Sequence, residues 1–179
     1  MTETPAPAPK PFLYVVVCAA GIASDISKLI TAAQERDWEA GVIATPLAMG
    51  FFDTAAVEAQ TGRPIRSAWR RPGDPRPFPA PDAVLVAPAT FNTVNKWAAG
   101  IADTLALGTL CEACGLGVPI AVLPCVGDAL AAHPAYRASL ERLGGMGVRF
   151  ADPYAGDVQE GGRRPEFGWE RGLELLAAW

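Results

Sequence analysis

Short polar side chains gather in the stretch VAPATFNTVNKWAAGIADTLA, residues 86–106, where an apolar segment runs into a helical one. They include Thr90, Asn92, Thr93, Asn95 and Asp103. The hydroxyl and amide groups among them can donate or accept hydrogen bonds without carrying a charge. A buried strand followed by a packing helix needs few such groups, so we interpret the stretch as part of a ligand-binding site.

Two further turns have residues that let backbone or a hydroxyl approach a ligand. In CAAGIAS, residues 18–24, the small residues Ala20 and Gly21 precede Ile22 at the start of a helical pattern. Thr45 follows a second apolar segment and can add a hydroxyl. The first turn matches neither GxGxxG nor the Gly-Lys-Ser/Thr of a P-loop. From the residues alone, a phosphate-binding turn and a purely structural turn are both open.

The cysteines and the single histidine do not indicate a metal centre. Cys111 and Cys114 have CxxC spacing, but no second cysteine pair or histidine cluster accompanies them. We interpret these two residues, together with Cys18 and Cys125, as buried thiols, and expect no metal site and no disulfide framework. We expect His133 to cap a helix or to lie at the surface.

Composition and charge indicate one compact domain. The chain has 179 residues, of which 50% are hydrophobic and 19% charged, with a net charge of −4. No basic run suits nucleic acid, and no apolar segment reaches the ~18 residues of a membrane span. Residues 1–11 are rich in Pro and Ala and lack the features of a signal peptide. We expect them to form a flexible tail before a single domain at 12–179, in a cytoplasmic protein.

Hydrophobic periodicity predicts strands that alternate with helices. Strands are expected at 12–19, 38–45, 64–69, 82–88, 118–124 and 147–153. Helices are expected at 22–36, 91–114, 128–143 and 166–179, and a turn followed by a helix is expected at 46–62. Residues 70–81 contain five prolines and one glycine, which predicts a stiff, extended surface loop.

This order of elements predicts the fold class and the place of the site. Strands joined by helices pair in parallel through right-handed crossovers, so we expect a flavodoxin- or Rossmann-like, three-layer, doubly wound α/β fold. Ligands of such sheets bind beyond the carboxyl ends of the strands. Because the polar residues follow expected strand ends, we predict that they line one ligand crevice.

Several of these segments resemble, in the same order, motifs of the flavin-containing cysteine decarboxylase family. PATFNT (88–93) is similar to the family's PASANT motif, and GIADTL (100–105) to the GxADxL stretch that follows it. CAAGIAS is similar to the GSIAA turn, TPLAMGFF (45–52) to the TxxAxxF element, and HPA (133–135) to the segment after strand five. The resemblance extends over 12–150, which is most of the chain.

The resemblance implies a cofactor and an assembly. Members of that family bind FMN between subunits and assemble from trimers, so FMN and a homo-oligomer built from trimers are expected here. Carried over by position, the turn after the first strand would meet the flavin phosphate and ribityl chain, and Asn92 would also face the substrate as a catalytic residue. The cofactor-binding residues would be Ala20, Gly21, Ile22, Thr45, Thr90, Phe91, Asn92 and Thr93.

The chain departs from the family at its catalytic positions. Residues 70–82 lack the histidine that the decarboxylases carry before the PASANT strand. PCVGDALA (124–131) replaces the PxMNxxMW substrate clamp, and 151–179 contain no counterpart of the late cysteine. That decarboxylation needs a base and a clamp for the substrate carboxylate. We therefore expect an FMN-dependent enzyme, a lyase or an oxidoreductase, that acts on a small substrate by different chemistry.

Three alternatives are open from the sequence. The protein could bind flavin without catalysis, as a carrier or partner subunit. It could resemble a flavin prenyltransferase, although only Arg137 and Arg142 follow the fifth expected strand closely enough to meet a prenyl phosphate. It could also be an α/β module without flavin, which keeps the motif for packing. The ligand that copurifies would distinguish these possibilities.

Overall fold

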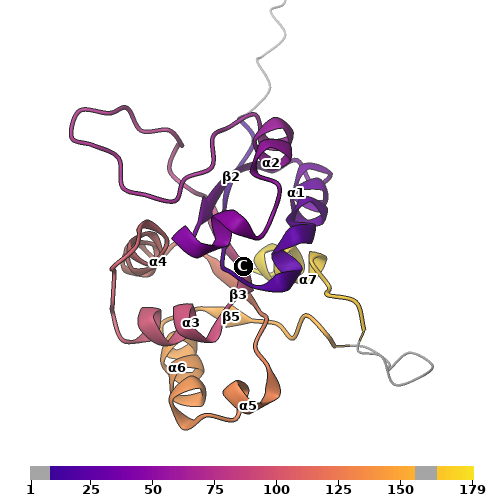
Figure 1. Ribbon diagram of the computed structural model, residues 1–179, viewed down its shortest axis with the longest axis vertical. Helices are drawn as coiled ribbons and strands as arrows, with labels where there is room; N and C mark the ends of the chain where they lie inside the picture. The colour runs from indigo at the N-terminus through magenta and orange to yellow at the C-terminus, as the bar shows by residue number, and fades with distance from the viewer. Residues whose placement is uncertain (1–8, 156–164) are drawn as a thin grey trace, which may run out of the picture.

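Five parallel strands form one sheet in the computed structural model, which describes residues 9–155 and 165–179. The strands are β1 (Phe12–Val17), β2 (Glu39–Ala44), β3 (Ala83–Ala89), β4 (Ile120–Pro124) and β5 (Arg149–Phe150). Their order in the sheet is β2-β1-β3-β4-β5, so the winding reverses between β1 and β3 (Figure 1). The predicted doubly wound, single-domain α/β fold is confirmed.

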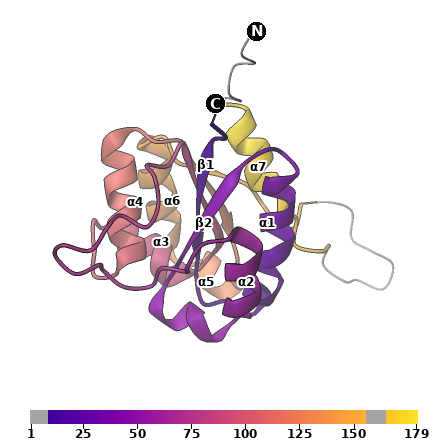
Figure 2. The same cartoon turned by 90° about the horizontal axis from the view of Figure 1, so that it is seen from above.

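Helices cover both faces of this sheet (Figure 2). One layer contains α1 (Ile26–Gln34), α2 (Thr54–Thr61) and α7 (Glu170–Ala177). The other contains α3 (Phe91–Ala98), α4 (Leu105–Leu116) and α6 (Pro134–Gly145). Alternate residues of β1 face the two layers, so both faces of the strand are apolar. Within the described ranges, no helix has the length and apolar character needed to cross a membrane.

Short helices follow three of the strands at their carboxyl ends. The 3₁₀ helices η1 (Gly21–Asp25) and η2 (Pro46–Gly50) follow β1 and β2. The single-turn helix α5 (Asp128–Ala131) follows β4. These connections lie where the sequence places its candidate ligand-binding residues.

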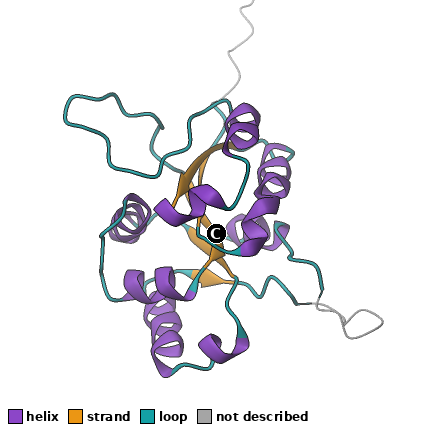
Figure 3. Ribbon diagram, viewed as in Figure 1, coloured by secondary structure: helices purple, strands orange, loops and turns teal. Residues whose placement is uncertain are grey.

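The prediction of a strand at 64–69 is wrong, because only one residue of this segment, Arg66, pairs with the sheet. The N–H of Arg66 donates to the carbonyl of Val42 at 3.0 Å, and the N–H of Ala44 donates to the carbonyl of Arg66 at 2.8 Å. Pro64 has no N–H, and the following prolines cannot continue the pairing. The predicted proline-rich loop is confirmed and runs from this bridge to β3 (Figure 3).

Two helices that we expected to be continuous are interrupted. The helix expected at 91–114 stops at Gly100, which takes a left-handed φ of 74° and closes a Schellman-type C-terminus for α3. The helix expected at 128–143 is broken at Pro134, which begins α6. The last strand and the last helix are shorter than expected, since β5 has 2 residues and α7 has 8.

Most of the tail expected at 1–11, before a domain at 12–179, lies outside the described residues. Within them, Lys10 Nζ lies 2.9 Å from Asp37 Oδ1, and the carbonyl of Pro11 accepts a hydrogen bond from the N–H of Glu39 at 2.9 Å. The boundary therefore stays a prediction, and the described end of the segment contacts the residues that lead into β2.

Candidate functional site

The turns that follow β1, β2 and β3 meet at one edge of the sheet. The N–H of Thr45 donates to the carbonyl of Val17 at 2.9 Å, which ties the end of β2 to the end of β1. The N–H of Cys18 donates to the carbonyl of Pro88 at 3.2 Å, which ties β1 to β3. This edge includes the point where the strand order reverses, the usual ligand site of an open α/β sheet.

The turn after β1 exposes its backbone. Ala20 is extended, with φ −132° and ψ 148°, and precedes η1 as its N-cap. Gly21 is exposed, and a Cβ added there would meet no atom within 4 Å. The first N–H groups of a helix lack intrahelical partners, so this turn can donate to an anion. Ile22 is partly buried and packs against the core, which anchors the turn.

Thr90 and Thr93 form a small hydrogen-bond network with Cys18. Thr90 caps α3: its Oγ1 accepts from the N–H of Thr93 at 3.4 Å and donates to Thr93 Oγ1 at 3.1 Å. Thr93 is buried, and its Oγ1 also accepts from Cys18 Sγ at 3.3 Å. Burial raises the pKa of the Cys18 thiol, although its hydrogen bond with Thr93 opposes that effect. The network holds the start of α3 against the end of β1.

Phe91 and Asn92, the first two residues of α3, have different environments. The Phe91 ring stacks on Tyr136 with centroids 5.7 Å apart and meets His133 edge to face at 5.8 Å. Asn92 is exposed, and its amide makes no hydrogen bond with any part of the chain that the structure describes. His133 Nδ1 accepts from the N–H of Ala135 at 3.1 Å, which confirms the predicted capping role. Asn92 therefore presents uncommitted donors and an acceptor at the edge.

A cavity of about 520 Å³ lies beside this edge, at the carboxyl ends of β4 and β5. Its polar groups include two carboxylates, Asp128 and Asp152, and two phenols, Tyr136 and Tyr154. Burial raises the pKa of Tyr136, so its hydroxyl stays protonated and can donate. A cavity of this volume can hold a small organic molecule. The predicted cofactor residues do not line this cavity. Among them Gly21 and Asn92 are exposed, Thr93 is buried, and the others are partly buried.

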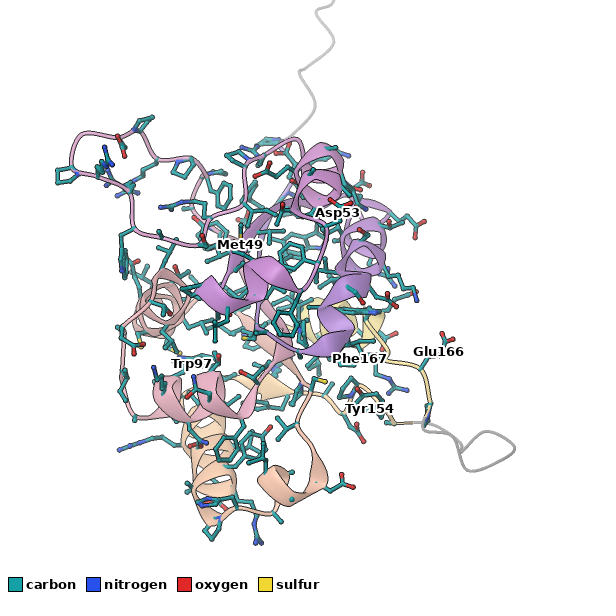
Figure 4. The ribbon with its side chains drawn as sticks, viewed as in Figure 1. Met49, Asp53, Trp97, Tyr154, Glu166 and Phe167 are labelled. Atoms are coloured by element: carbon teal, nitrogen blue, oxygen red, sulfur yellow. The ribbon has the colours of Figure 1, made fainter. Side chains whose placement is uncertain are left out.

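Side-chain contacts fix Tyr154 within this region. Its hydroxyl lies 3.6 Å from Cys125 Sγ, and its ring meets Phe167 edge to face at 5.5 Å (Figure 4). Cys125 is itself tied to the sheet, because its N–H donates to the carbonyl of Ala89 at 2.8 Å. Contacts with Cys125 at the end of β4 and with Phe167 before α7 therefore hold the Tyr154 phenol in place.

The four cysteines are free thiols with different exposure. Cys18 is buried as predicted, whereas Cys111, Cys114 and Cys125 are only partly buried, so that expectation is wrong for three of them. Their segments are only partly covered: the apolar helix α4 exposes Leu116, and the chain leaves the core after β4. Among the described residues, no group of three or more His, Cys, Asp or Glu side chains could hold a metal ion.

The polar side chains that line the cavity were not among the residues predicted for the site. Asp128 lies in PCVGD, a segment that follows an expected strand end and so belongs to the predicted crevice, but no role was assigned to its carboxylate. Its place directly after a buried strand was a usable signal, the same one that identified Thr45 and Thr90. Asp152 was placed inside the strand expected at 147–153, whereas β5 ends at Phe150, so Asp152 and Tyr154 in fact follow the strand.

The strand order and the polar groups at its carboxyl edge place the protein among doubly wound α/β proteins that bind ligands at the switch point. A family model described as Flavoprotein matches residues 2–165. The chain belongs to the flavoprotein family.

Individual relatives agree with this assignment over parts of the chain. A segment of 72 residues, 40% of the chain, is 38% identical to the coenzyme A biosynthesis bifunctional protein CoaBC of Thermococcus kodakarensis. The match covers 18% of that protein, so the chain corresponds to only a small part of this curated relative.

Solved structures share the fold over nearly the whole chain. The FMN-dependent cysteine decarboxylase SpaF superposes with a TM-score of 0.70 and 24% identity, over 95% of this chain and 98% of its own. The FMN-binding protein AtHal3 gives a TM-score of 0.70 and 19% identity, over 95% of this chain and 98% of its own. At these identities the likeness establishes the fold.

Proposed function

We propose that the protein binds FMN at the edge formed by the turns after β1, β2 and β3, and acts as an FMN-dependent enzyme on a small molecule held in the adjacent cavity. The observation that carries the proposal is the convergence of open backbone at Gly21, hydroxyls at Thr45 and Thr90, and the uncommitted amide of Asn92. Membership of the flavoprotein family supports a flavin, and the names of SpaF and AtHal3 support FMN in particular.

Each group at the edge suits a different part of FMN. The N–H groups of Gly21 and Ile22 begin a helix, where an anionic phosphate is favoured. Thr45 and Thr90 can meet the hydroxyls of the ribityl chain. Asn92 is free to contact the flavin ring or the substrate beside it. When bound, FMN would supply a two-electron acceptor, while the chain would bind, orient and exchange protons with the substrate.

We propose chemistry other than the standard decarboxylation of a cysteine. Residues 70–82 contain no histidine, and His133 accepts a hydrogen bond from the backbone at the start of α6. Proton transfer would therefore fall to groups of the cavity, of which the Tyr154 phenol and the Asp128 carboxylate lie at the carboxyl ends of the strands. The two carboxylates of the cavity favour a substrate that carries an amine or another cationic group.

We also propose that the protein is a homo-oligomer built from trimers. Leu47 is 78% exposed and Phe51 is 42% exposed, and both follow Thr45 at the proposed flavin edge. A neighbouring subunit would cover these apolar side chains and complete the open side of the site. Light scattering of the flavin-loaded protein measures this directly, and a monomer with bound flavin would contradict a site shared between subunits.

The cofactor proposal is tested by the absorbance spectrum of the purified protein, followed by mass analysis of the ligand after denaturation. We expect a flavin spectrum and the mass of FMN. FAD alone, or no flavin after reconstitution, would overturn the assignment. Flavin reduction or turnover with amine-bearing candidate substrates then separates an enzyme from a flavin carrier, because a carrier would hold FMN without changing its redox state.

A further inference from the structure

A second cavity lies between the proline-rich loop and α4. The proline-rich loop before β3 projects beside α4 (Figures 1 and 2) and encloses a cavity of about 540 Å³. Its floor includes Tyr14 of β1 and Ile43 of β2, and its far wall includes Thr109 and Glu112 of α4. It shares no lining residue with the edge that carries Gly21, Thr45 and Thr90 or with the cavity at β4 and β5.

The lining of this loop cavity is strongly basic. Four of its residues are arginines: Arg66, Arg70, Arg71 and Arg76. None of the four forms an ion pair with a carboxylate anywhere in the described ranges. Glu112 is the one carboxylate among the lining residues. Asp74, at the loop tip, accepts from the backbone N–H of Arg71 at 2.8 Å, while its carbonyl accepts from Arg70 Nη1 at 2.8 Å. Positive charge therefore exceeds negative charge around the cavity.

Three aromatic residues, Tyr14, Trp69 and Phe78, also line the cavity, and the fold holds two of them in place. Trp69 is 60% exposed, yet its indole lies directly over Gly108 of α4, where an added Cβ would come within 2.3 Å of the ring. The Tyr14 hydroxyl donates to the carbonyl of Pro79 at 2.7 Å, which ties the loop to β1. A large exposed indole that is positioned by a glycine provides a flat surface for a ligand ring.

The positive charges of two lining arginines influence the Tyr14 phenol, which is part of the cavity wall. Burial raises the pKa of Tyr14, and the positive charges of Arg66 and Arg76 are the two strongest influences that oppose this effect. Both arginines therefore lie close enough to the half-buried phenol to stabilise negative charge there. An anion that entered the cavity would experience the same two charges.

We propose that the loop cavity binds a small organic phosphate that carries a planar ring. Guanidinium groups match the geometry of phosphate oxygens and bind them with paired hydrogen bonds. Four arginines opposed by one carboxylate suit a doubly charged phosphate better than a single carboxylate, and the Trp69 indole suits a planar ring. The volume lies within the range of small-molecule sites. The proposal concerns a ligand additional to the proposed FMN and does not depend on FMN binding.

Calorimetric titration of the protein as purified tests the proposal, with phenyl phosphate as the probe. Inorganic phosphate alone and phenol alone are titrated separately. We expect phenyl phosphate to bind more tightly than either, and high salt to weaken it because the attraction is electrostatic. The double variant Arg66→Gln, Arg76→Gln should weaken binding about tenfold or more, since each substitution removes a charged hydrogen-bond donor. Arg137→Gln, which removes an exposed arginine on α6, is the matched control and should leave the affinity unchanged.

Gly108→Ala provides a second variant that leaves every arginine in place. The new methyl group would displace the Trp69 indole, so phenyl phosphate should bind more weakly while inorganic phosphate binds as before. The proposal is overturned if phenyl phosphate does not bind at millimolar concentration, or if Arg137→Gln weakens it as much as the double variant does. Loss of copurified flavin from the double variant would also overturn it, because the cavity would then be the flavin site itself. Flavin retained by every variant, with phenyl phosphate lost from the double variant, supports a separate site.

Discussion

Replacing Thr90 by valine and Asn92 by alanine should affect different properties of the protein. Thr90→Val removes the oxygen that caps α3 and the partner of the Thr93 hydroxyl. Loss of an N-cap costs about 0.5–2 kcal/mol, and the 3.4 Å distance to the Thr93 N–H places this cap near the middle of that range or below. The buried Thr93 hydroxyl loses a neighbour as well, which adds up to about 1 kcal/mol. We expect the apo protein to lose about 1–2 kcal/mol of unfolding free energy.

Asn92→Ala should leave the apo protein almost unchanged. The side chain is exposed and has no hydrogen bond to the described residues, and alanine is a good helix former. The unfolding free energy should therefore change by less than about 0.5 kcal/mol. If the amide contacts FMN, losing that bond should weaken flavin binding about tenfold. If it faces the substrate instead, turnover should fall while flavin affinity is retained.

The assays are urea denaturation of the apo proteins and flavin titration followed by quenching of flavin fluorescence. Thr90→Ser keeps the hydroxyl and is the matched control: it should retain both the stability and the flavin affinity of the parent protein. An Asn92→Ala protein with unchanged flavin affinity and unchanged turnover would refute the placement of that amide in the site. A loss of apo stability equal to that of Thr90→Val would show instead that Asn92 has a structural role.

Substitutions at two glycines should affect different properties, flavin affinity in one case and the free energy of unfolding in the other. Gly21→Ala should leave urea denaturation of the apo protein unchanged, because the new Cβ meets no atom within 4 Å, but should lower flavin affinity; an unaltered affinity would contradict close approach of the cofactor. Gly41→Ala should lose about 1–3 kcal/mol of unfolding free energy in the same assay, because its Cβ would lie 2.9 Å from the buried Phe78 ring. Cys18 should make stability depend on pH: burial raises its pKa, so the unfolded chain loses this proton first as the pH rises above the ordinary thiol value of 9.0, and the unfolding free energy should fall there. The Cys18→Ala protein should lose that part of the decline, and an identical pH profile would disprove it.

The sheet and the place of the site could be predicted because they depend on local patterns. All seven residues of β3 are buried, and a strand covered on both faces reads as a continuous apolar segment. Polar residues placed directly after such a strand, as Thr90 is, identify the ligand edge without knowledge of the strand order. The segment at 64–69 shows the limit of this reasoning, because its own residues suit a strand while Pro64 and the prolines after it prevent pairing.

The finer parts of the site depend on contacts between residues far apart in the chain. The hydrogen bond from Cys18 to Thr93 joins positions 75 residues apart, and no periodicity within either segment indicates it. The loop cavity exists because Trp69 rests on Gly108, a contact between a loop and a helix that lie on opposite sides of β3 in the sequence. The proline content predicted that the loop would be extended, but it did not predict that the loop would pack against α4.

The single bridge at Arg66 has a consequence for how the molecule behaves at high concentration. β2 is an edge strand, and an exposed edge offers unpaired backbone groups that a second chain can use to extend the sheet and begin aggregation. Arg66 occupies the carbonyl of Val42 and the N–H of Ala44, so the donor and acceptor on this part of the edge are already taken. The segment that occupies them carries a positive charge and begins at a proline, so it cannot itself recruit a further strand. The segment at 64–69, which we expected to be a strand, therefore blocks pairing with a second chain at this part of the β2 edge.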